Sequence, residues 1–499
     1  MEKQKCNIVW LKRDLRLQDH LPFNAAVRAG LPVLVLYCFE ASLVNAAESS
    51  VRHWRFVWQS LQDIQRQLNQ YKTSVFIFYE EVETILEKIA NHYEIKTIFS
   101  TQEIGIKITF DRDKRIKKFC DNNKINWQEF PQDGIKRGRK NRIGWQAEME
   151  EWLFSKPIKT DFSELISCKI PDRILKEISQ RKIPKLWQEN NEIFQPGGET
   201  FAQKYLQSFL THRAALYNKQ LSKPKASRKS CSRLSPYIAW GNITARQILL
   251  EVETALPRSQ FSLMFNAFKE RIWWRAHYLQ KFESDCLMEF RPINRAFEKM
   301  PRNFTPQIFE AWATGKTGFP MIDASMRCLE QTGYLNFRMR AMLATFITFP
   351  LWQEWKVGAI HLAKLFLDFE PGIHYPQYQM QAGLTGYHTL RVYNPTIQAQ
   401  QHDKEGTFIY EWVPELRNVP VPLLFEPWKM TALEQQWYRC EIGKDYPAPI
   451  VDFEKESRIA KERYWNFRNQ KQTLAALPSV WERLCIPENR VLYEKQLGL

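Results

Sequence analysis

The polar side chains best suited to chemistry gather in four segments of the C-terminal half, each beside aromatic residues. The first segment, Cys231 to Tyr237, has serines and a proline ahead of a helical run. The start of a helix offers free backbone N–H groups that can bind phosphate. Ser232 and Ser235 could equally act as ordinary helix caps, and capping alone is the better explanation of this segment taken by itself.

The second segment, Glu270 to Tyr278, is expected to be helical. It would place Arg271 and Arg275 on one face, with Trp274 on the adjoining face. Two cations so close repel each other unless an anion or a carboxylate lies between them, which suggests phosphate. A pair of surface arginines beside core tryptophans explains the pattern equally well, so both interpretations stay open.

The third segment runs from Trp312 to Arg340 and contains Gly315-Lys316-Thr317. A P-loop needs another glycine five residues before the glycine of Gly-Lys-Thr, but position 310 is a glutamate. We therefore reject nucleoside triphosphate hydrolysis.

The fourth segment, Asp368 to Tyr375, carries two carboxylates next to an interruption of helical structure that is expected at Pro371. Carboxylates among aromatic rings must be paired, and the arginines of the third segment are the available partners. His374, taken alone, is more often structural than catalytic.

Two different domains must position these segments. Up to residue 130, β-branched and aromatic runs at 7–11, 32–39, 74–79 and 97–100 alternate with helical patterns, as where Trp54, Val57, Leu61, Ile64 and Leu68 share one face. This alternation predicts an α/β fold with a doubly wound parallel sheet, whose ligand crevice lies at the carboxyl ends of the strands. The first strand leads into Lys12 to Arg16 instead of glycines, so no dinucleotide site is expected there.

The remainder is expected to form a connector and an all-helical domain. The basic run from Lys136 to Arg142 is more readily a solvated connector, packed on both domains, than a nucleic-acid contact. Beyond Gly198 helical periodicity dominates, and eleven of the eighteen tryptophans lie there. The predicted division is 1–130 (α/β), 131–197 (connector) and 198–499 (all-helical).

Composition limits the partners and the compartment. The net charge of +16 favours a polyanion such as DNA, although an even solubility charge would give the same total. The nine cysteines contain no C-x-x-C pair, so we expect free thiols and no metal. With no apolar stretch of spanning length and no secretory signal, we expect a cytoplasmic protein without a membrane partner.

Six motifs together resemble the photolyase/cryptochrome family, in order and over nearly the whole chain. They are Val9–Arg16, Ser232–Tyr237, Trp312–Arg327, Val392–Pro395, Trp412–Leu416 and Tyr446–Asp452. The resemblance implies an N-terminal antenna domain and a C-terminal domain that binds FAD. It also allows for a second, light-harvesting pigment (a folate, a deazaflavin or a flavin), which no motif identifies.

The resemblance implies a set of cofactor-binding positions. They are Tyr217, Cys231, Ser232, Arg233, Leu234, Ser235, Arg275, Arg340, Asp368, Phe369, Glu370 and His374. In the family the pair matched by Arg340 and Asp368 lies along the isoalloxazine, and the position of His374 faces flavin N5.

The resemblance also implies damaged DNA as the partner, with a base flipped out of the duplex. Trp274 matches the wall of the lesion pocket, Arg338 and Arg391 match strand contacts, and Arg271 stands where the best-known dimer photolyases carry a glutamate. A second departure is Phe337 with Ala341, in place of Asn and Met or, in (6-4) photolyases, of two histidines.

The family's electron-transfer chain of three tryptophans is altered as well. Only its middle member, Trp355, is retained, and Tyr378 takes the place nearest the flavin. The leading hypothesis is blue-light-driven, FAD-dependent repair of cyclobutane pyrimidine dimers by a monomeric enzyme. The alternatives are a cryptochrome-like photoreceptor without repair activity and, least favoured, a light-independent nucleotide-binding protein.

Overall fold

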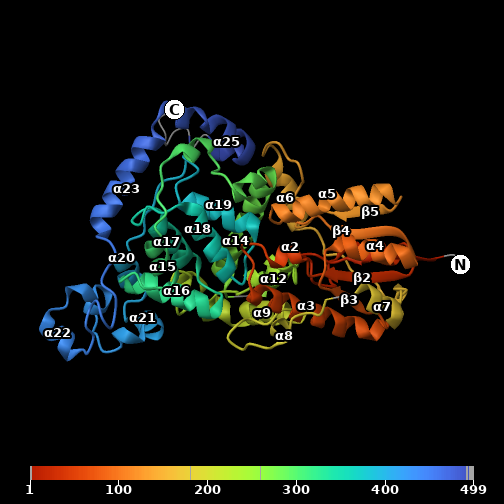
Figure 1. Cartoon of the computed structure of the whole chain (residues 1–499), viewed down its shortest axis with the longest axis horizontal. Coiled ribbons are helices and arrows are strands. Elements are labelled where there is room, and N and C mark those ends of the chain that lie inside the picture. Colours follow the sequence, from red (N-terminus) through yellow and green to blue (C-terminus); the bar gives the residue numbers. More distant parts are fainter. Residues whose placement is uncertain (1–2, 180, 259, 491–492, 494–499) are drawn as a thin grey trace.

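The chain folds into an α/β domain and a helical domain that lie against each other (Figure 1). The structure, a computed structural model, describes residues 3–179, 181–258, 260–490 and 493. Within these residues no helix is long and apolar enough to cross a membrane. All nine cysteines are free thiols, and only Cys286 is not fully buried.

Five parallel strands form the sheet of the first domain, as the alternation of strand-like and helical runs predicts. The strands are β1 (Gln4–Trp10), β2 (Val33–Cys38), β3 (Val75–Phe78), β4 (Tyr93–Thr101) and β5 (Asn126–Phe130), in the order β3-β2-β1-β4-β5. The chain moves from β1 to β2 on one side and later returns to β4 on the other. The carboxyl ends of β1 and β4 therefore border the crevice that this topology creates.

The edge strand β5 is missing from the runs recognised in the sequence. Its five residues, Asn126–Phe130, include only two aromatic side chains among polar ones, and none is fully buried. Because an edge strand pairs on one side only, it carries a weaker hydrophobic signal than a central strand.

Helices cover both faces of the sheet and separate two apolar cores. The helices of this domain are α1 (Leu21–Arg28), α2 (Ala41–Val44), α3 (Val51–Leu68), α4 (Val82–His92) and α5 (Lys107–Asn122). The five apolar residues predicted to share one face of α3 are all buried. The core on the α1 and α3 side continues without a break into the helical domain, whereas α4 and α5 enclose a separate core.

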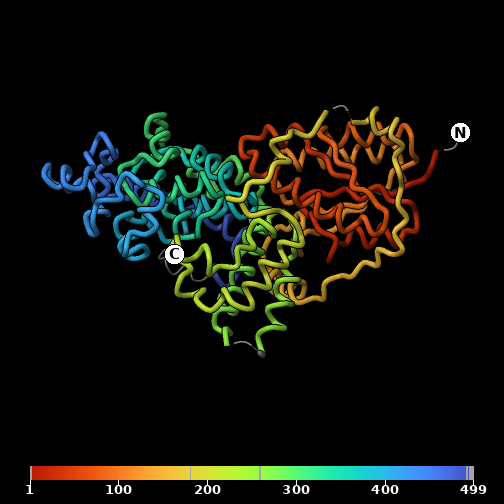
Figure 2. The backbone as a smooth tube through the Cα atoms, turned by 90° about the horizontal axis from the view of Figure 1, so that it is seen from below, coloured from red at the N-terminus to blue at the C-terminus, as the bar shows by residue number. Residues whose placement is uncertain are grey.

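The connector runs around the outer side of the α/β domain (Figure 2) and contains α6 (Trp145–Leu153), α7 (Asp172–Ile178) and α8 (Lys185–Gln188). The expectation of a solvated basic run is wrong at Arg142, which is 1% exposed. Its guanidinium stacks 4.4 Å from the Trp145 ring and donates to the backbone oxygen of His277 at 2.7 Å. The helical domain closes over this part of the connector.

The second domain is helical, and among the residues that are described no β-strand follows Gly198. Its helices are α9 (Glu199–Thr211), α10 (Tyr217–Gln220), α11 (Ser227–Ser230), α12 (Ser235–Ala239), α13 (Ala245–Ala255), α14 (Ser262–Ser284), α15 (Pro306–Ala313), α16 (Pro320–Thr332), α17 (Phe337–Thr348), α18 (Trp355–Leu365), α19 (Pro371–Gln381), α20 (Pro395–His402), α21 (Thr407–Trp412), α22 (Ala432–Trp437), α23 (Phe453–Arg468), α24 (Lys471–Ala475) and α25 (Leu477–Leu484). Helices α14, α17, α18 and α19 pack against one another at its centre.

The two domains touch through their backbones. Gly241, just after α12, has φ +70°, and a Cβ atom there would lie 2.2 Å from the backbone oxygen of Arg13. Arg16 donates to the backbone oxygen of the same glycine at 3.0 Å. Only glycine fits here, because a side chain would force the domains apart.

Candidate functional site

The segment between α18 and α19 carries the two predicted carboxylates. Pro371 occupies the first turn of α19, where its missing N–H costs no helical hydrogen bond, so the helix begins directly after Glu370. Arg340 on α17 donates to Asp368 Oδ2 at 2.8 Å, as the sequence predicts. Burial alone would raise the pKa of Asp368, but the Arg340 charge together with hydrogen bonds to the carboxylate outweighs burial and lowers it.

Glu370 has a different partner from the one expected. It forms a two-fold ion pair with Arg275 on α14, in which Nε and Oε2 are 3.0 Å apart, and the same guanidinium donates to Asp133 of the connector at 2.7 Å. Two carboxylates therefore hold Arg275. The expectation that third-segment arginines would pair both carboxylates is met at Asp368 but not at Glu370, whose partner lies 95 residues away along the chain.

His374 lies on the first turns of α19 and is held as a neutral ring. Its Nε2 is 2.8 Å from the backbone oxygen of Ala359, an atom that can only accept, so this nitrogen carries the proton. Burial lowers the pKa of His374 to about 4. The Phe369 ring packs edge-on against it, with centroids 5.4 Å apart. At neutral pH the ring is therefore uncharged and fixed in one tautomer.

The first segment does not cap its helix in the predicted way. Helix α12 begins at Ser235 without any side-chain cap, and Ser232 Oγ accepts only a long bond of 3.4 Å from the Leu234 N–H. Arg233 has φ +59°, and its guanidinium donates to Gln195 at 2.6 Å while stacking 3.7 Å from the Tyr334 ring. Cys231 and Leu234 are buried, whereas Ser235 is exposed.

An exposed rim of aromatic and arginine side chains lies beside these groups, on α14, α17 and the loop before α20. We call Arg271, Trp274, Phe337, Arg338 and Tyr393 the aromatic–arginine rim. Trp274 is 46% exposed and Phe337 41%. The Arg271 and Arg338 guanidinium groups lie 5.4 and 5.2 Å from the Phe337 ring, and Arg338 is also 5.4 Å from the Tyr393 ring.

Two further residues of the predicted site, Tyr217 and Arg391, differ in burial. Buried Tyr217 lies against Arg271, whose charge and hydrogen bond offset only part of the rise in the pKa of Tyr217 that burial causes. Arg391 is exposed on the loop after α19. Tyr393 belongs to the motif Val392–Pro395 but was assigned no role in the site from the sequence, and it joins the rim through its contact with Arg338 on α17.

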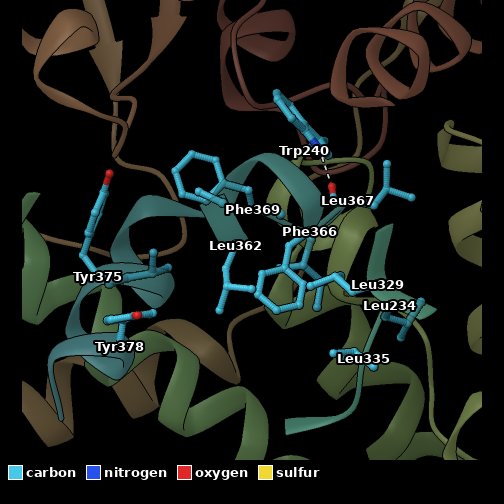
Figure 3. Close-up of a cluster of buried hydrophobic side chains, with 14 of the residues drawn as sticks. Leu234, Trp240, Leu329, Leu335, Leu362, Phe366, Leu367, Phe369, Tyr375 and Tyr378 are labelled. Atoms are coloured by element: carbon cyan, nitrogen blue, oxygen red, sulfur yellow. Dashed lines mark hydrogen bonds between the residues drawn. The ribbon is translucent and has the colours of Figure 1, made fainter. Parts of the chain in front are cut away.

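Tyr378 and Trp355 lie together beneath His374. The Tyr378 ring is 6.0 Å from the His374 ring and 6.4 Å from the Trp355 ring. Figure 3 shows Tyr378 with Tyr375 and Phe369 in a cluster of buried side chains. The Tyr378 hydroxyl is buried and has no hydrogen-bond partner.

Comparison with known proteins identifies the class to which this fold and site belong. Residues 7–135 match the family model described as DNA photolyase, and residues 268–466 match the FAD-binding domain of DNA photolyase. The chain is 27% identical over 476 residues to the deoxyribodipyrimidine photo-lyase of Alkalihalophilus pseudofirmus, covering 91% of this chain and 96% of that protein. It is 26% identical to cryptochrome DASH of Synechocystis sp., covering 89% and 95%.

Solved structures share the same two-domain fold. The Synechocystis sp. PCC6803 cryptochrome superposes with a TM-score of 0.81 at 23% identity, covering 93% of this chain and 99% of that one. The class III photolyase from Agrobacterium tumefaciens gives 0.80 at 23% identity, covering 94% and 99%. The photolyase from Sulfolobus tokodaii, solved with two FAD molecules, gives 0.77 at 23% identity, covering 93% and 100%.

The class is thus a flavoprotein with an α/β domain and a helical FAD-binding domain. The chain belongs to the photolyase/cryptochrome family, and FAD is its cofactor. The residues present fit a polar cofactor of this kind. Asp368 Oδ1 is buried without a hydrogen-bond partner, Ser235 is exposed, and the Arg340 side chain beside Asp368 keeps 28% of its surface open.

Proposed function

We propose that the protein repairs cyclobutane pyrimidine dimers in DNA with blue light. The observation that carries the proposal is the exposed Trp274 on α14, one residue before Arg275 and three residues after Arg271 of the same helix. A base that has left the duplex needs a π-face to stack on and cations near its phosphates. The net charge of +16 suits the same partner.

We assign the cofactor roles to the groups that surround Asp368. Arg340 fixes the Asp368 carboxylate, Arg275 orients Glu370, and neutral His374 offers a polar ring with one fixed tautomer. The other cofactor positions are Tyr217, Cys231, Ser232, Arg233, Leu234, Ser235 and Phe369. When bound and reduced, FAD supplies under blue light the electron that splits the dimer.

We assign DNA contacts to the exposed side of the site. Trp274 stacks against the flipped base, while Arg338 and Arg391 bind the strand. Arg271 faces the same side as a cation instead of the carboxylate of the best-known dimer enzymes, so it would contact phosphate or a base oxygen. Trp355 and Tyr378 are assigned to electron delivery, since their rings lie in sequence behind His374.

The test is direct repair. Reduced holoprotein is mixed with an oligonucleotide that carries one thymine dimer, as a single strand and as a duplex, and thymine recovery is followed under blue light. We expect recovery on at least one substrate and none in the dark. Flavin-loaded protein that recovers no thymine from either substrate would overturn the proposal.

A variant pair locates the lesion contact. Trp274→Ala should weaken binding to the dimer by about 1 to 3 kcal/mol, because stacking on one aromatic ring contributes that much. Trp437→Ala is the matched control, since Trp437 is also exposed (66%) but lies on α22, in another region of the chain. Equal affinities for the two variants would remove Trp274 from the site.

The second candidate is a blue-light photoreceptor that binds FAD without repair. Two side chains of the rim favour it: Arg271 reverses the charge expected at the lesion, and Phe337 adds an apolar ring there. A stable light-induced change in the flavin spectrum, together with no repair on either strand form, would favour this function.

A further inference from the structure

A small cavity lies at the crevice where the parallel sheet would bind a ligand. It is bordered by the carboxyl ends of β1 and β2 and by the loop after β4, and the helical domain closes it from the other side with Trp240, Phe369 and Pro371. Its volume is about 50 Å³. On this scale about 10–15 Å³ holds one water molecule, so the cavity has room for only a few.

An ion-pair network fills the rest of the crevice. Arg112 on α5 binds Glu40, Glu103 and Asp113, each at 2.8 Å. All four side chains are at least 93% buried. The Arg112 guanidinium also lies 4.8 Å from the Trp10 ring, on which Lys12 Nζ sits at 4.1 Å. Charges paired in this way cannot move apart without leaving a buried ion unpaired.

A flat three-ring pigment does not fit this arrangement. It would need a slot many times the size of the cavity, and opening one would separate Arg112 from its carboxylates. Leaving a buried charge without its partner costs about 3 to 5 kcal/mol, which corresponds to a loss of about two to four orders of magnitude in affinity. The space that the fold offers to a ligand is therefore already used by the protein's own side chains.

Arg13 connects this network to the flavin-site segment. Its Nε lies 3.7 Å from Glu103 Oε1, and its Nη1 donates to the backbone oxygen of Phe369 at 2.9 Å. The guanidinium stacks 4.2 Å from the Trp240 ring.

Trp240 in turn donates from Nε1 to the backbone oxygen of Leu367 at 3.1 Å, the dashed line in Figure 3. Together, Arg13 and Trp240 hold the backbone carbonyls on either side of Asp368.

We propose that the crevice takes no flavin or deazaflavin as a second pigment and instead fastens the α/β domain to residues 367–370, with Arg13 as a positioning residue for Asp368. Arg13 lies in the motif that follows β1, a position where dinucleotide-binding folds place glycines. In this chain the position bears a cation that crosses to the other domain. The inference depends on FAD binding and not on repair, so loss of the repair proposal would leave it intact.

Pigment content is the first test. Holoprotein loaded with FAD is titrated with excess FMN, and bound flavin is separated by gel filtration, released by heat and identified chromatographically. We expect one FAD per chain and no bound FMN. One equivalent of FMN retained beside FAD would overturn the proposal.

The second test separates positioning from simple loss of structure. Arg13→Met should shift the visible absorption bands of bound FAD and raise its dissociation constant about tenfold or more, because a charged hydrogen bond to the site backbone is lost. Arg13→Lys keeps the cation and should recover part of both effects. An Arg13→Met protein whose flavin spectrum and affinity match the wild type would overturn the role of Arg13.

Arg112→Met is the matched control for that test. Arg112 is equally buried and ion-paired, but its partners Glu40, Glu103, Asp113 and Trp10 all lie in the α/β domain. It should lower the stability of the fold while leaving the flavin spectrum unchanged. A spectral shift as large as that of Arg13→Met would show that any damage to the network disturbs the flavin, which contradicts a specific role for Arg13.

Discussion

The crevice of the α/β domain and the segment around Asp368 are both polar, partly buried and placed where a ligand could bind. They differ in how completely their charged groups are paired. In the crevice Arg112 has three carboxylate partners and little free volume remains. Around Asp368 one carboxylate oxygen has no partner and the paired Arg340 is still partly open. The two regions therefore differ in whether their charged groups are fully paired, as around Arg112, or leave a carboxylate oxygen open, as at Asp368.

Removal of Arg112, the centre of the crevice network, should have the largest effect on stability. Arg112→Met takes the cation from buried Glu40 and leaves Glu103 and Asp113 with longer ion pairs to Arg13 (3.7 Å) and Lys12 (3.3 Å), so the free energy of unfolding should fall by about 3 to 5 kcal/mol. Urea denaturation followed by circular dichroism measures the change. A loss below about 1 kcal/mol would mean that the network does not hold the domain together.

In the Asp368 segment a comparable substitution should act mainly on the cofactor. Asp368→Ala removes the partner of Arg340, and we expect flavin affinity to fall by about 2 to 3 kcal/mol, or about 30- to 150-fold. Fluorescence titration of the apoprotein with FAD measures it. Glu415→Ala is the control, because Glu415 forms a similar ion pair with Arg327 elsewhere in the domain. Equal affinities of the two variants would contradict the assignment of Asp368.

Acid should affect the segment through His374. Burial holds the pKa of His374 at about 4, whereas an unfolded histidine titrates near 6.5, so the unfolded chain binds a proton first. Stability should therefore fall as the pH drops from about 6.5 to about 4, by about 3 kcal/mol from this residue. His374→Asn should make the pH dependence of thermal unfolding shallower by that amount, while His212→Asn, at an exposed position, should not.

The smallest effect on stability is expected at Tyr378. Its buried hydroxyl has no partner, so Tyr378→Phe should change the free energy of unfolding by less than about 1 kcal/mol, or raise it slightly. Photoreduction of FAD should nevertheless become markedly slower, because phenylalanine is much harder to oxidise than tyrosine. An unchanged rate under steady blue light would exclude Tyr378 from the electron route.

Much of this architecture could be predicted from the sequence because its signals are local. The strand runs and the apolar face of α3 follow from spacing alone, and the pairing of Asp368 with an arginine of the third segment follows from the need to neutralise a carboxylate among aromatic rings. Motif resemblance supplied the family, which the comparisons confirm.

What could not be predicted depends on contacts between distant parts of the chain. Glu370 meets Arg275 and Asp133 only after the connector has folded across both domains, and no spacing rule joins positions 133, 275 and 370. Arg142 carries the sequence signal of a solvated residue, but the helical domain covers it. Similarly, Ser232 and Ser235 were expected to cap α12 but do not, because the chain enters this short helix through the turn at Arg233.

The contact at Gly241 limits how the protein could pass on a structural change caused by light. The backbone of one domain rests directly on that of the other at this point, and Arg13 reaches across beside it. A relative movement of the two domains would therefore have to break both contacts. Gly241→Ala, which adds a single methyl group at this contact, would disturb the packing of both domains at once.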